Sequence, residues 1–393
     1  NNTTGSQNTA VGRGALDSNT TASNNTAVGY YALEANTTAD QNAAFGKSAL
    51  AANTTGGNQT AIGFNALAAN TTGAANTALG SSALAAATTA NDNVAVGAGA
   101  LQANETGIYN VAVGRMALIA SLASSNTAVG YKALEADTTG NSNIAIGREA
   151  MADNTTANNN LAIGYQALYV NTTTPNNVAV GNYSQTANTG GSENTTVGYS
   201  AAQANTTGSN LVAIGTWALN GNTTGQNNIA LGRSAGDVTT TGSNNITIGY
   251  GADPTGATES NEITLGTSTQ DTLRCQVTSI TSLSDERDKT DIIDLPLGID
   301  FLNTIRPVKF TWKHREPVPS KDGTQKAGFI AQELDKAQKD AGVKDYMKLV
   351  LDNNPDKLEA SVGHLLPVLV KAVQELSAQN EALVARITAL ESN

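Results

Sequence analysis

The chain has 393 residues and a formal net charge of −11, with 39% hydrophobic and only 4% aromatic residues. This acidity argues against a nucleic-acid partner, and no apolar run approaches the roughly 20 residues that a membrane span needs. The single cysteine, Cys275, excludes an intrachain disulfide and is expected to be a small buried side chain. Because the chain begins at Asn1 inside a repeat, we expect the natural N-terminus and its attachment to other proteins to be missing.

One short phrase recurs through residues 1–266, as in "NTAVG" at 8–12, "NTALG" at 76–80 and "NITIG" at 245–249. Its sixteen glycines stand at every seventeenth position, and only the interval from Gly114 to Gly130 is shorter, by one position. A unit this short cannot bury a core of its own, so the units must stack. The units lack helix-length apolar stripes, and the alternating phrase is typical of a short strand. The sequence therefore predicts a parallel β-solenoid with one coil per unit.

The residue type at each position of the repeat predicts where its side chain lies in the coil. The large apolar residue before the Gly is expected to face the core of the coil, and the Ala before that to face a place with room only for a methyl group. Asn stands four residues before the Gly in thirteen units, which predicts a ladder of stacked amides. The Gly itself indicates a positive φ or a close backbone approach. The recurrent "NTT" matches the glycosylation triplet but is interpreted as turn chemistry.

The residue after the Gly is often cationic or aromatic, and in a stack these side chains would form a stripe. Two interpretations stay open: a stripe that binds glycans or another surface, and an exterior ladder that only stabilises the rod. The residues concerned are Arg13, Tyr30, Lys47, Phe64, Arg115, Tyr131, Arg148, Tyr165, Tyr199, Arg233 and Tyr250. The units contain no Asp-rich column of the kind that binds calcium, so we expect no metal and no cofactor.

These repeats resemble the head repeats of trimeric autotransporter adhesins, whose "SVAIG"-like units form a parallel β-roll in a trimer. The resemblance covers residues 1–266, although each unit here is a few residues longer than a unit of that family. It implies a homotrimer, in which the Ala column would face the threefold axis. The shape and hand of the coil are left open by the difference in unit length.

Residues 267–283 break the repeat and alternate weakly, which predicts a short β neck. At Ser284 the chain becomes charged: of its 22 Lys and Arg residues, seven occur up to Arg274 and fifteen follow Ser284. Taken alone, "SDERDK" at 284–289 is typical of a solvated turn. With "FLNTIRPVKFTWK" at 301–313 and "GFIAQEL" at 328–334, residues 284–393 resemble the intramolecular chaperone domain of the peptidase S74 type. That domain terminates bacteriophage tail fibres and endosialidase tailspikes.

The resemblance implies a domain that trimerises the preceding fibre and then cuts itself off. By position in the motif, Ser284 and Lys289 would form a Ser–Lys dyad, and the bond between Leu283 and Ser284 would be cut. A serine hydroxyl needs a base to take its proton, and a lysine can act as one only when it is neutral. Asp285 and Arg287 are expected to support the turn or the dyad. Gln332 and Glu333 of the third motif are expected to contact a neighbouring chain.

The C-terminal segment shows apolar spacing of three and four, which predicts a coiled-coil helix over 365–391. Its seam consists of Leu369, Val373, Leu376, Asn380, Leu383, Ile387 and Leu390, with Leu366 before it. A strict heptad seam is buried against partner helices, and a single Asn within it sets the register. The seam does not reveal the number of helices, for which the family implies three.

Taken together, the sequence predicts a mainly β chain with three parts: a trimeric shaft at 1–266, a neck at 267–283 and an α+β chaperone domain at 284–393. The expected function is a phage tail fibre or virion appendage with one autoproteolytic cut. It would be made in the host cytoplasm and displayed on the virion. Its partners would be two further copies, other virion proteins, and a glycan or protein receptor on the host. The alternatives are a bacterial trimeric adhesin, a depolymerising tailspike, which needs paired carboxylates, and an ice-binding solenoid.

Overall fold

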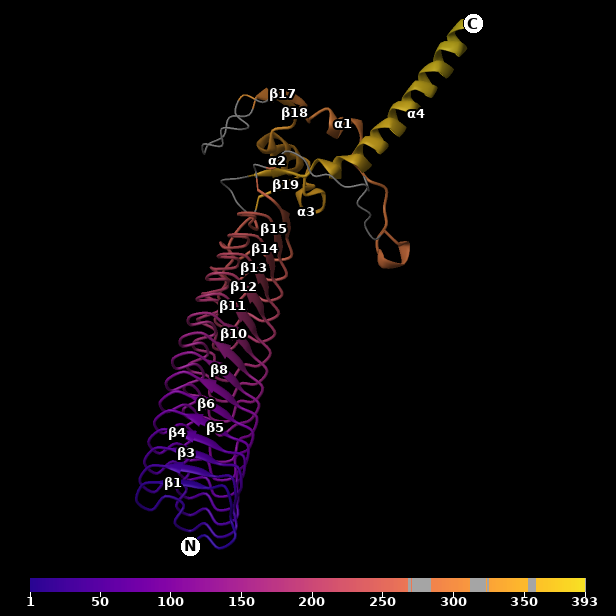
Figure 1. The fold of residues 1–393 in the computed structure, drawn as a ribbon. Helices are drawn as coiled ribbons and strands as arrows, with labels where there is room; N and C mark the ends of the chain where they lie inside the picture. The colour runs from indigo at the N-terminus through magenta and orange to yellow at the C-terminus, as the bar shows by residue number, and fades with distance from the viewer. Residues whose placement is uncertain (268–269, 271–283, 312–322, 324, 353–357, 393) are drawn as a thin grey trace. The chain divides into compact units, whose positions relative to one another are not determined.

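The computed structural model describes residues 1–267, 270, 284–311, 323, 325–352 and 358–392. The chain divides into two compact units, residues 1–267 and residues 268–393. The first is a rod of stacked coils, and the described part of the second combines short helices and one long C-terminal helix with two small sheets (Figure 1). The predicted fold class, a parallel β-solenoid followed by an α+β region, is confirmed. Of the predicted neck at 267–283 the structure describes only residues 267 and 270, and Cys275 lies outside the described residues.

The shaft is one sixteen-stranded parallel sheet in which each strand pairs with the strand of the next coil. Each strand has three residues, and the repeated phrase sets the register, so that Ala10 lies beside Ala27 and Ala27 beside Ala44. The strands are β1 (Thr9–Val11), β2 (Thr26–Val28), β3 (Ala43–Phe45), β4 (Thr60–Ile62), β5 (Thr77–Leu79), β6 (Val94–Val96), β7 (Val111–Val113), β8 (Thr127–Val129), β9 (Ile144–Ile146), β10 (Leu161–Ile163), β11 (Val178–Val180), β12 (Thr195–Val197), β13 (Val212–Ile214), β14 (Ile229–Leu231), β15 (Ile246–Ile248) and β16 (Ile263–Leu265).

The strands turn their small residue inward and their large residues outward, which is the reverse of the prediction. Ala27 and Ala44 are fully buried, whereas Phe45 and Ile62 are 40% and 39% exposed. The reason is the "AL" pair after the Gly, because leucines such as Leu33 are fully buried in the same core cluster. A leucine entering from that segment leaves room only for a methyl group from the strand. The Ala column therefore cannot face a threefold axis, since it lies inside its own coil.

The repeated Gly forms a corner that no other residue can occupy without strain. Gly130 has a φ of 140°, and a Cβ placed on it would lie 2.4 Å from the carbonyl oxygen of Gly147. The other corner glycines from Gly29 to Gly232 show the same two features. Both expectations for this position, a positive φ and a close backbone approach, are confirmed.

Two columns of buried amides run along the rod. In the predicted column, four before the Gly, the backbone N–H of Asn42 donates to Oδ1 of Asn25 at 2.9 Å, and Nδ2 of Asn25 donates to the carbonyl of Ala39 at 3.0 Å. Most bonds of this column run from side chain to backbone, but the expected amide-to-amide bonds also occur in it, as from Nδ2 of Asn93 to Oδ1 of Asn76 at 3.1 Å. Stacked amides are more regular in the Asn of "NTT", where Nδ2 of Asn53 donates to Oδ1 of Asn36 at 3.0 Å. This second column is buried, so its triplets serve the fold.

The coil from Gly114 to Gly130 is the short one, and it loses its one residue in the polar turn. The flanking strands β7 and β8 nevertheless pair in the common register, with Val111 beside Thr127. Ser121 takes the place of the ladder Asn here, and its hydroxyl donates to Oδ2 of Asp137 in the next coil at 2.9 Å. The turn can therefore change length without disturbing the sheet.

The second unit has a small core of its own around Phe301, Leu334, Met347 and Leu349. Its two sheets are antiparallel pairs, β17 with β18 and β19 with β20. The elements are η1 (Glu286–Asp288), α1 (Ile299–Leu302), β17 (Val308–Thr311), β18 (Gln325–Gly328), α2 (Ala331–Asp340), α3 (Lys344–Met347), β19 (Val350–Leu351), β20 (Glu359–Ala360), η2 (Val362–Leu365) and α4 (Leu366–Glu391).

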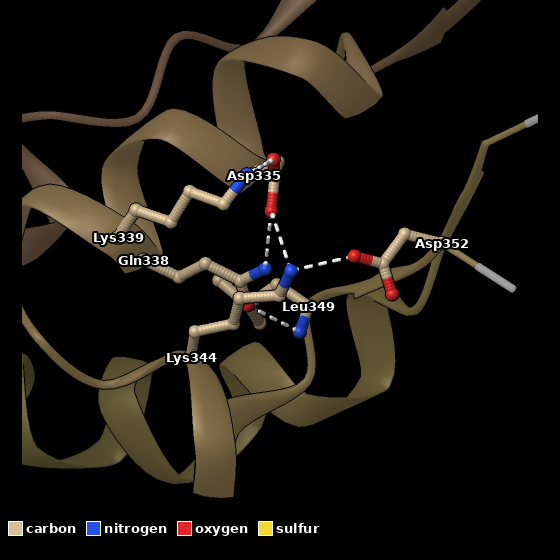
Figure 2. Close-up of polar contacts among 6 residues, drawn as sticks. All are labelled: Asp335, Gln338, Lys339, Lys344, Leu349 and Asp352. Atoms are coloured by element: carbon tan, nitrogen blue, oxygen red, sulfur yellow. Dashed lines mark hydrogen bonds and ion pairs between the residues drawn. The ribbon is translucent and has the colours of Figure 1, made fainter. Parts of the chain in front are cut away.

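A buried amide joins helix α2 to the chain that enters strand β19 (Figure 2). Gln338 is fully buried; its Oε1 accepts the backbone N–H of Leu349 at 2.8 Å, and its Nε2 donates to Asp335 at 3.0 Å. Lys339 and Lys344 both approach the carboxylate of Asp335. Because Lys339 lies beside it, the pKa of the Asp335 carboxyl is held below its usual value. This network ties the surface charges of α2 to the core.

Helix α4 is packed on its own unit only over its first turns. Val368 and Ala372 are buried, and the carboxylate of Glu375 accepts the backbone N–H of Ile299 at 2.8 Å. Beyond Glu375 every described residue of the helix is exposed. In the part of the chain that the structure describes, no helix is both long and apolar enough to cross a membrane.

Candidate functional site

The start of the second unit brings together the two residues of the predicted dyad. Nζ of Lys289 donates to Oγ of Ser284 at 2.6 Å, and it lies 3.3 Å from the carbonyl oxygen of Ser284. The spacing of the two residues allows this contact because the intervening residues form the 3-10 turn η1. Leu283, the other side of the predicted scissile bond, lies outside the described residues.

Asp285 and Arg287 shape the turn that holds this pair. The carboxylate of Asp285 caps η1 by accepting the backbone N–H of Arg287 at 2.9 Å, and it also accepts Nε of the same side chain at 3.0 Å. The guanidinium holds the pKa of the Asp285 carboxyl below its usual value. Arg287 is therefore engaged in an ion pair with Asp285, and the carboxylate compensates the positive charge that the guanidinium would otherwise exert on Lys289.

The Ser284–Lys289 pair is open to solvent in the single chain. Both residues are exposed, and η1 contains no buried residue. In this contact the amine of Lys289 donates to the serine oxygen, whereas a general base must accept the proton of the serine hydroxyl. The pair has the geometry that a Ser–Lys nucleophile requires, and it lacks the desolvated surroundings that would make the amine a base.

Two exposed isoleucines follow the pair directly. Ile292 and Ile293 are 63% and 82% exposed, although they belong to the residue types that proteins most often bury. They stand in "DIID", between acidic residues, in a segment without regular structure. Sequence reasoning passed over them, because a short apolar run in a charged segment has no periodicity to reveal it.

The two downstream motifs meet at one groove. Arg306, from "FLNTIRPVKFTWK", forms an ion pair with Glu333, from "GFIAQEL", and this pair lies at a groove of about 700 Å³. The apolar part of its lining consists of Pro296, Leu297, Phe301, Ala337 and Ala341. Arg306 also lowers the pKa of the Glu333 carboxyl. Glu333 was expected to contact a neighbouring chain, and the structure gives it this partner within its own chain.

The remaining predicted site residues are exposed. Gln332 is exposed on α2, and the seam of α4 has no partner within the described residues. Its apolar members are all exposed: Leu369, Val373, Leu376, Leu383, Ile387 and Leu390, with Asn380 among them. Among the described residues, His, Cys, Asp and Glu side chains form no group of three that could hold a metal ion.

The molecule is thus a repeat shaft joined to an α+β unit that opens with a bonded Ser–Lys pair. Residues 284–343 match the peptidase S74 family, described as chaperone of endosialidase. The match is confined to the start of the second unit and does not extend into the shaft. No curated protein and no solved structure matches the chain.

Proposed function

We propose that this chain forms the trimeric shaft of a phage tail fibre or related virion appendage. Its C-terminal unit would direct trimerisation and then cut the chain between Leu283 and Ser284. The observation that carries the proposal is the 2.6 Å contact between Nζ of Lys289 and Oγ of Ser284, at the first residues of the segment that matches the chaperone family. The mature shaft would remain on the virion and contact the host surface.

The cut proceeds by acyl transfer within the chain. Oγ of Ser284 attacks the carbonyl carbon of Leu283, and its proton passes to the neutral amine of Lys289. The bond from that carbon to the nitrogen of Ser284 breaks, and Lys289 returns the proton to the nitrogen. Water then hydrolyses the ester, which leaves a carboxylate on Leu283 and restores the Ser284 hydroxyl. Each chain is cut once, without turnover.

The exposure of the Ser284–Lys289 pair supports a cleavage that takes place only after the copies have assembled. Lys289 must lose its proton to act, and a lysine does so readily only when it is withdrawn from water or placed near another cation. Neighbouring copies seated on Ile292 and Ile293 would cover the pair. Cleavage would then follow trimerisation, so that an unassembled chain keeps its chaperone.

Two uncharged and largely apolar surfaces support association of identical copies. One is the seam of α4, and the other is the outward face of the shaft sheet, which we call the sheet stripe and define as the first and third residues of strands β1–β16. No member of the sheet stripe is charged, although the chain has a net charge of −11. Identical copies present this stripe with the same rise per coil, so that parallel rods in register can bury it continuously.

The proposal is tested by the intact mass of the purified protein beside three variants. Wild type should split into a shaft ending at Leu283 and a fragment beginning at Ser284. Ser284→Ala should stay whole because it lacks the nucleophile, and Lys289→Arg because a guanidinium does not release its proton. Thr290→Ala, an exposed hydroxyl beside the pair, is the matched control and should be cut normally.

Full-length mass for wild type would refute the self-cleavage. If Ser284→Ala were cut like wild type, the cut would come from another group or from a contaminating protease. Sedimentation of the uncut Ser284→Ala protein tests the assembly separately and should give three times the chain mass of 40.0 kDa. A monomer at micromolar concentration would refute the trimer.

A further inference from the structure

One stretch of the shaft carries a continuous row of aromatic rings on its surface. We call it the aromatic ladder and define it as Tyr165, Tyr183, Tyr199 and Trp217, flanked by Arg148 and Arg233. Successive ring centroids are 5.2, 5.8 and 6.4 Å apart. The guanidinium carbon of Arg148 lies 5.3 Å from the ring centre of Tyr165, and that of Arg233 lies 5.1 Å from Trp217. The row thus extends over six consecutive coils.

The ladder is built from two positions of the repeat. Tyr165 and Tyr199 directly follow their corner Gly, whereas Tyr183 and Trp217 stand one residue later. That later position has a left-handed backbone in coils all along the shaft, with φ of 60° at Tyr183 and 61° at Trp217. Neighbouring coils place Ser200 and Ser234 there. Large rings are uncommon in this conformation, so the geometry of the repeat does not itself require aromatic residues at these two positions.

The ring geometry leaves aromatic faces available. Neighbouring rings are close to perpendicular, with interplanar angles of 77°, 85° and 78°. In an edge-to-face row, the rings that contribute their edges keep both faces free of their ladder neighbours. Tyr199 and Trp217 are 47% and 36% exposed, so the row is open to solvent.

The surroundings of the ladder are almost uncharged. Between residues 154 and 232 the chain contains one acidic residue, Glu193, and no basic residue. Glu193 stands in the polar turn before strand β12, away from the two ladder positions. The aromatic rings themselves are uncharged, and of the two arginines at the ends of the row, Arg148 is paired with Glu149. On a chain of net charge −11, which repels anions, this surface suits an uncharged ligand better than an anionic one.

We infer that the aromatic ladder binds a neutral, extended hexopyranose chain lying along the rod. The C–H faces of pyranose rings stack on aromatic faces, and sugar hydroxyls can bond the phenol, indole and guanidinium groups of the row. Coils stacked about 4.8 Å apart repeat at close to the length of one sugar unit in an extended glycan. The inference gives a ligand class to the adhesive part of the proposed function and rests on it.

The test uses the full chain, because the shaft alone has not been shown to fold. The chain has two tryptophans, Trp217 and Trp312, so a Trp312→Phe variant reports on the ladder alone by fluorescence. A neutral glucan hexasaccharide is titrated, with a hyaluronan octasaccharide as the anionic comparison. We expect saturable quenching or a spectral shift with the glucan, and at least tenfold weaker binding of hyaluronan.

Calorimetry of the glucan with a Tyr183→Ser, Tyr199→Ser double variant then tests the site. Serine occupies the equivalent positions in other coils, at Ser200 and Ser81, so the variant should fold. Affinity should fall at least tenfold in the double variant. It should be unchanged in Tyr109→Ser, which removes an exposed ring outside the ladder.

Three results would overturn the inference. One is the absence of saturable binding by wild type, and another is equal binding by wild type and the double variant. The third is a double variant whose glucan affinity is unchanged but whose structure is affected. A loss of thermal stability would make the row a structural ladder, and a smaller sedimenting species would make it an interface. A chain that assembles and cuts itself but binds no glucan refutes this inference alone. A chain that binds glucan but neither assembles nor cuts refutes only the proposed shaft.

Discussion

Asp137 places a titratable group inside the amide ladder of the shaft. Its side chain is buried, Oδ2 accepts the hydroxyl of Ser121 at 2.9 Å, and Oδ1 accepts Nδ2 of Asn154 at 2.8 Å. Burial raises the pKa of Asp137 to about 6, although the hydrogen bonds from Ser121, Asn154 and the backbone of Gly140 act in the opposite direction. Between about pH 4 and pH 6 the Asp137 carboxyl is therefore largely protonated in the folded shaft, whereas it is ionised in the unfolded chain.

This shift predicts a shaft that loses stability as the pH rises. A carboxyl whose pKa is raised on folding contributes its full stabilisation below its unfolded value, near 4, and loses it as the pH rises to about 6. The loss is on the order of 2–3 kcal/mol per chain. In Asp137→Asn this dependence should vanish, because the amide continues the ladder without ionising. Thermal unfolding of both proteins at pH 4.5 and 7.5 measures it. An equal difference between them at both pH values would contradict the assignment.

The corner Gly predicts the costliest single substitution in the shaft. Gly130→Ala adds a Cβ at 2.4 Å from the backbone oxygen of Gly147 and forces an alanine to a φ of 140°. We expect a loss of roughly 2–5 kcal/mol in the free energy of unfolding, from overpacking and backbone strain together. Denaturant unfolding measures it, with Gly57→Ala as the control, where the only close contact is 3.1 Å and no positive φ occurs. Equal losses in both variants would show that the corner is not special.

At the residue scale, the sequence supported the glycine corner and one amide column but reversed the two faces of the strand. Alternation of small and large residues shows that a strand has two faces, but it does not show which one is inside. The usual preference for large residues in the core misled the prediction, because the space was already filled by leucines such as Leu33 from the next segment. The Asn of "NTT" was likewise taken for a turn residue, since its partner lies one whole coil away.

Among the coils, the one from Gly181 to Gly198 departs most from the common core. Ser184, Gln185 and Thr196 stand where most coils have Ala, Leu and Ala, and the two hydrophobic clusters of the shaft end on either side of them. The hydroxyls of Ser184 and Thr196 bond each other at 2.7 Å. Neither amide atom of the fully buried Gln185 has a hydrogen-bond partner among the described residues. Because the stability of a stacked repeat is a sum over neighbouring units, we expect this coil to be a weak junction of the shaft.

Gln185→Leu should therefore stabilise the shaft. Leucine occupies the same left-handed position in other coils, for example Leu168 with a φ of 51° against 52° at Gln185. Removing an unpaired buried amide should gain roughly 1–3 kcal/mol. Hydrogen exchange should show faster backbone exchange in this coil of wild type than in its neighbours, and equal protection in the variant. Uniform protection along the wild-type shaft would contradict a weak junction.

Helix α4 shows how far an element can be predicted. The heptad spacing indicated a helix over 365–391, and the structure has one at Leu366–Glu391. The spacing could not reveal that Val368 and Ala372, outside the seam, pack on the unit itself. The same limit applies to the groove beside Arg306 and Glu333, since these residues belong to two separate motifs that only the fold brings together.

For the whole molecule, the proposed trimer makes a prediction about the sheet stripe. If parallel copies meet there, Ile146→Cys should form a disulfide between chains, because equivalent residues of symmetric copies approach one another at a shared axis. Cys275→Ser removes the chain's only other thiol. Thr156→Cys, exposed in the polar turn, is the matched control. Under oxidising conditions, a non-reducing gel should show linked chains for Ile146→Cys and single chains for Thr156→Cys. The reverse pattern would place the contact on another face.

The shortened coil between Gly114 and Gly130 has a consequence for how such shafts change over generations. Its sheet register survives the loss of one residue, and every strand pairs only with its immediate neighbours. A tandem duplication or deletion of one whole unit should then alter the length of the shaft by one rise and leave both ends intact. Recombination between near-identical units supplies such changes readily. The length of the shaft is thus a heritable trait that can be adjusted in small equal steps, independently of the terminal unit.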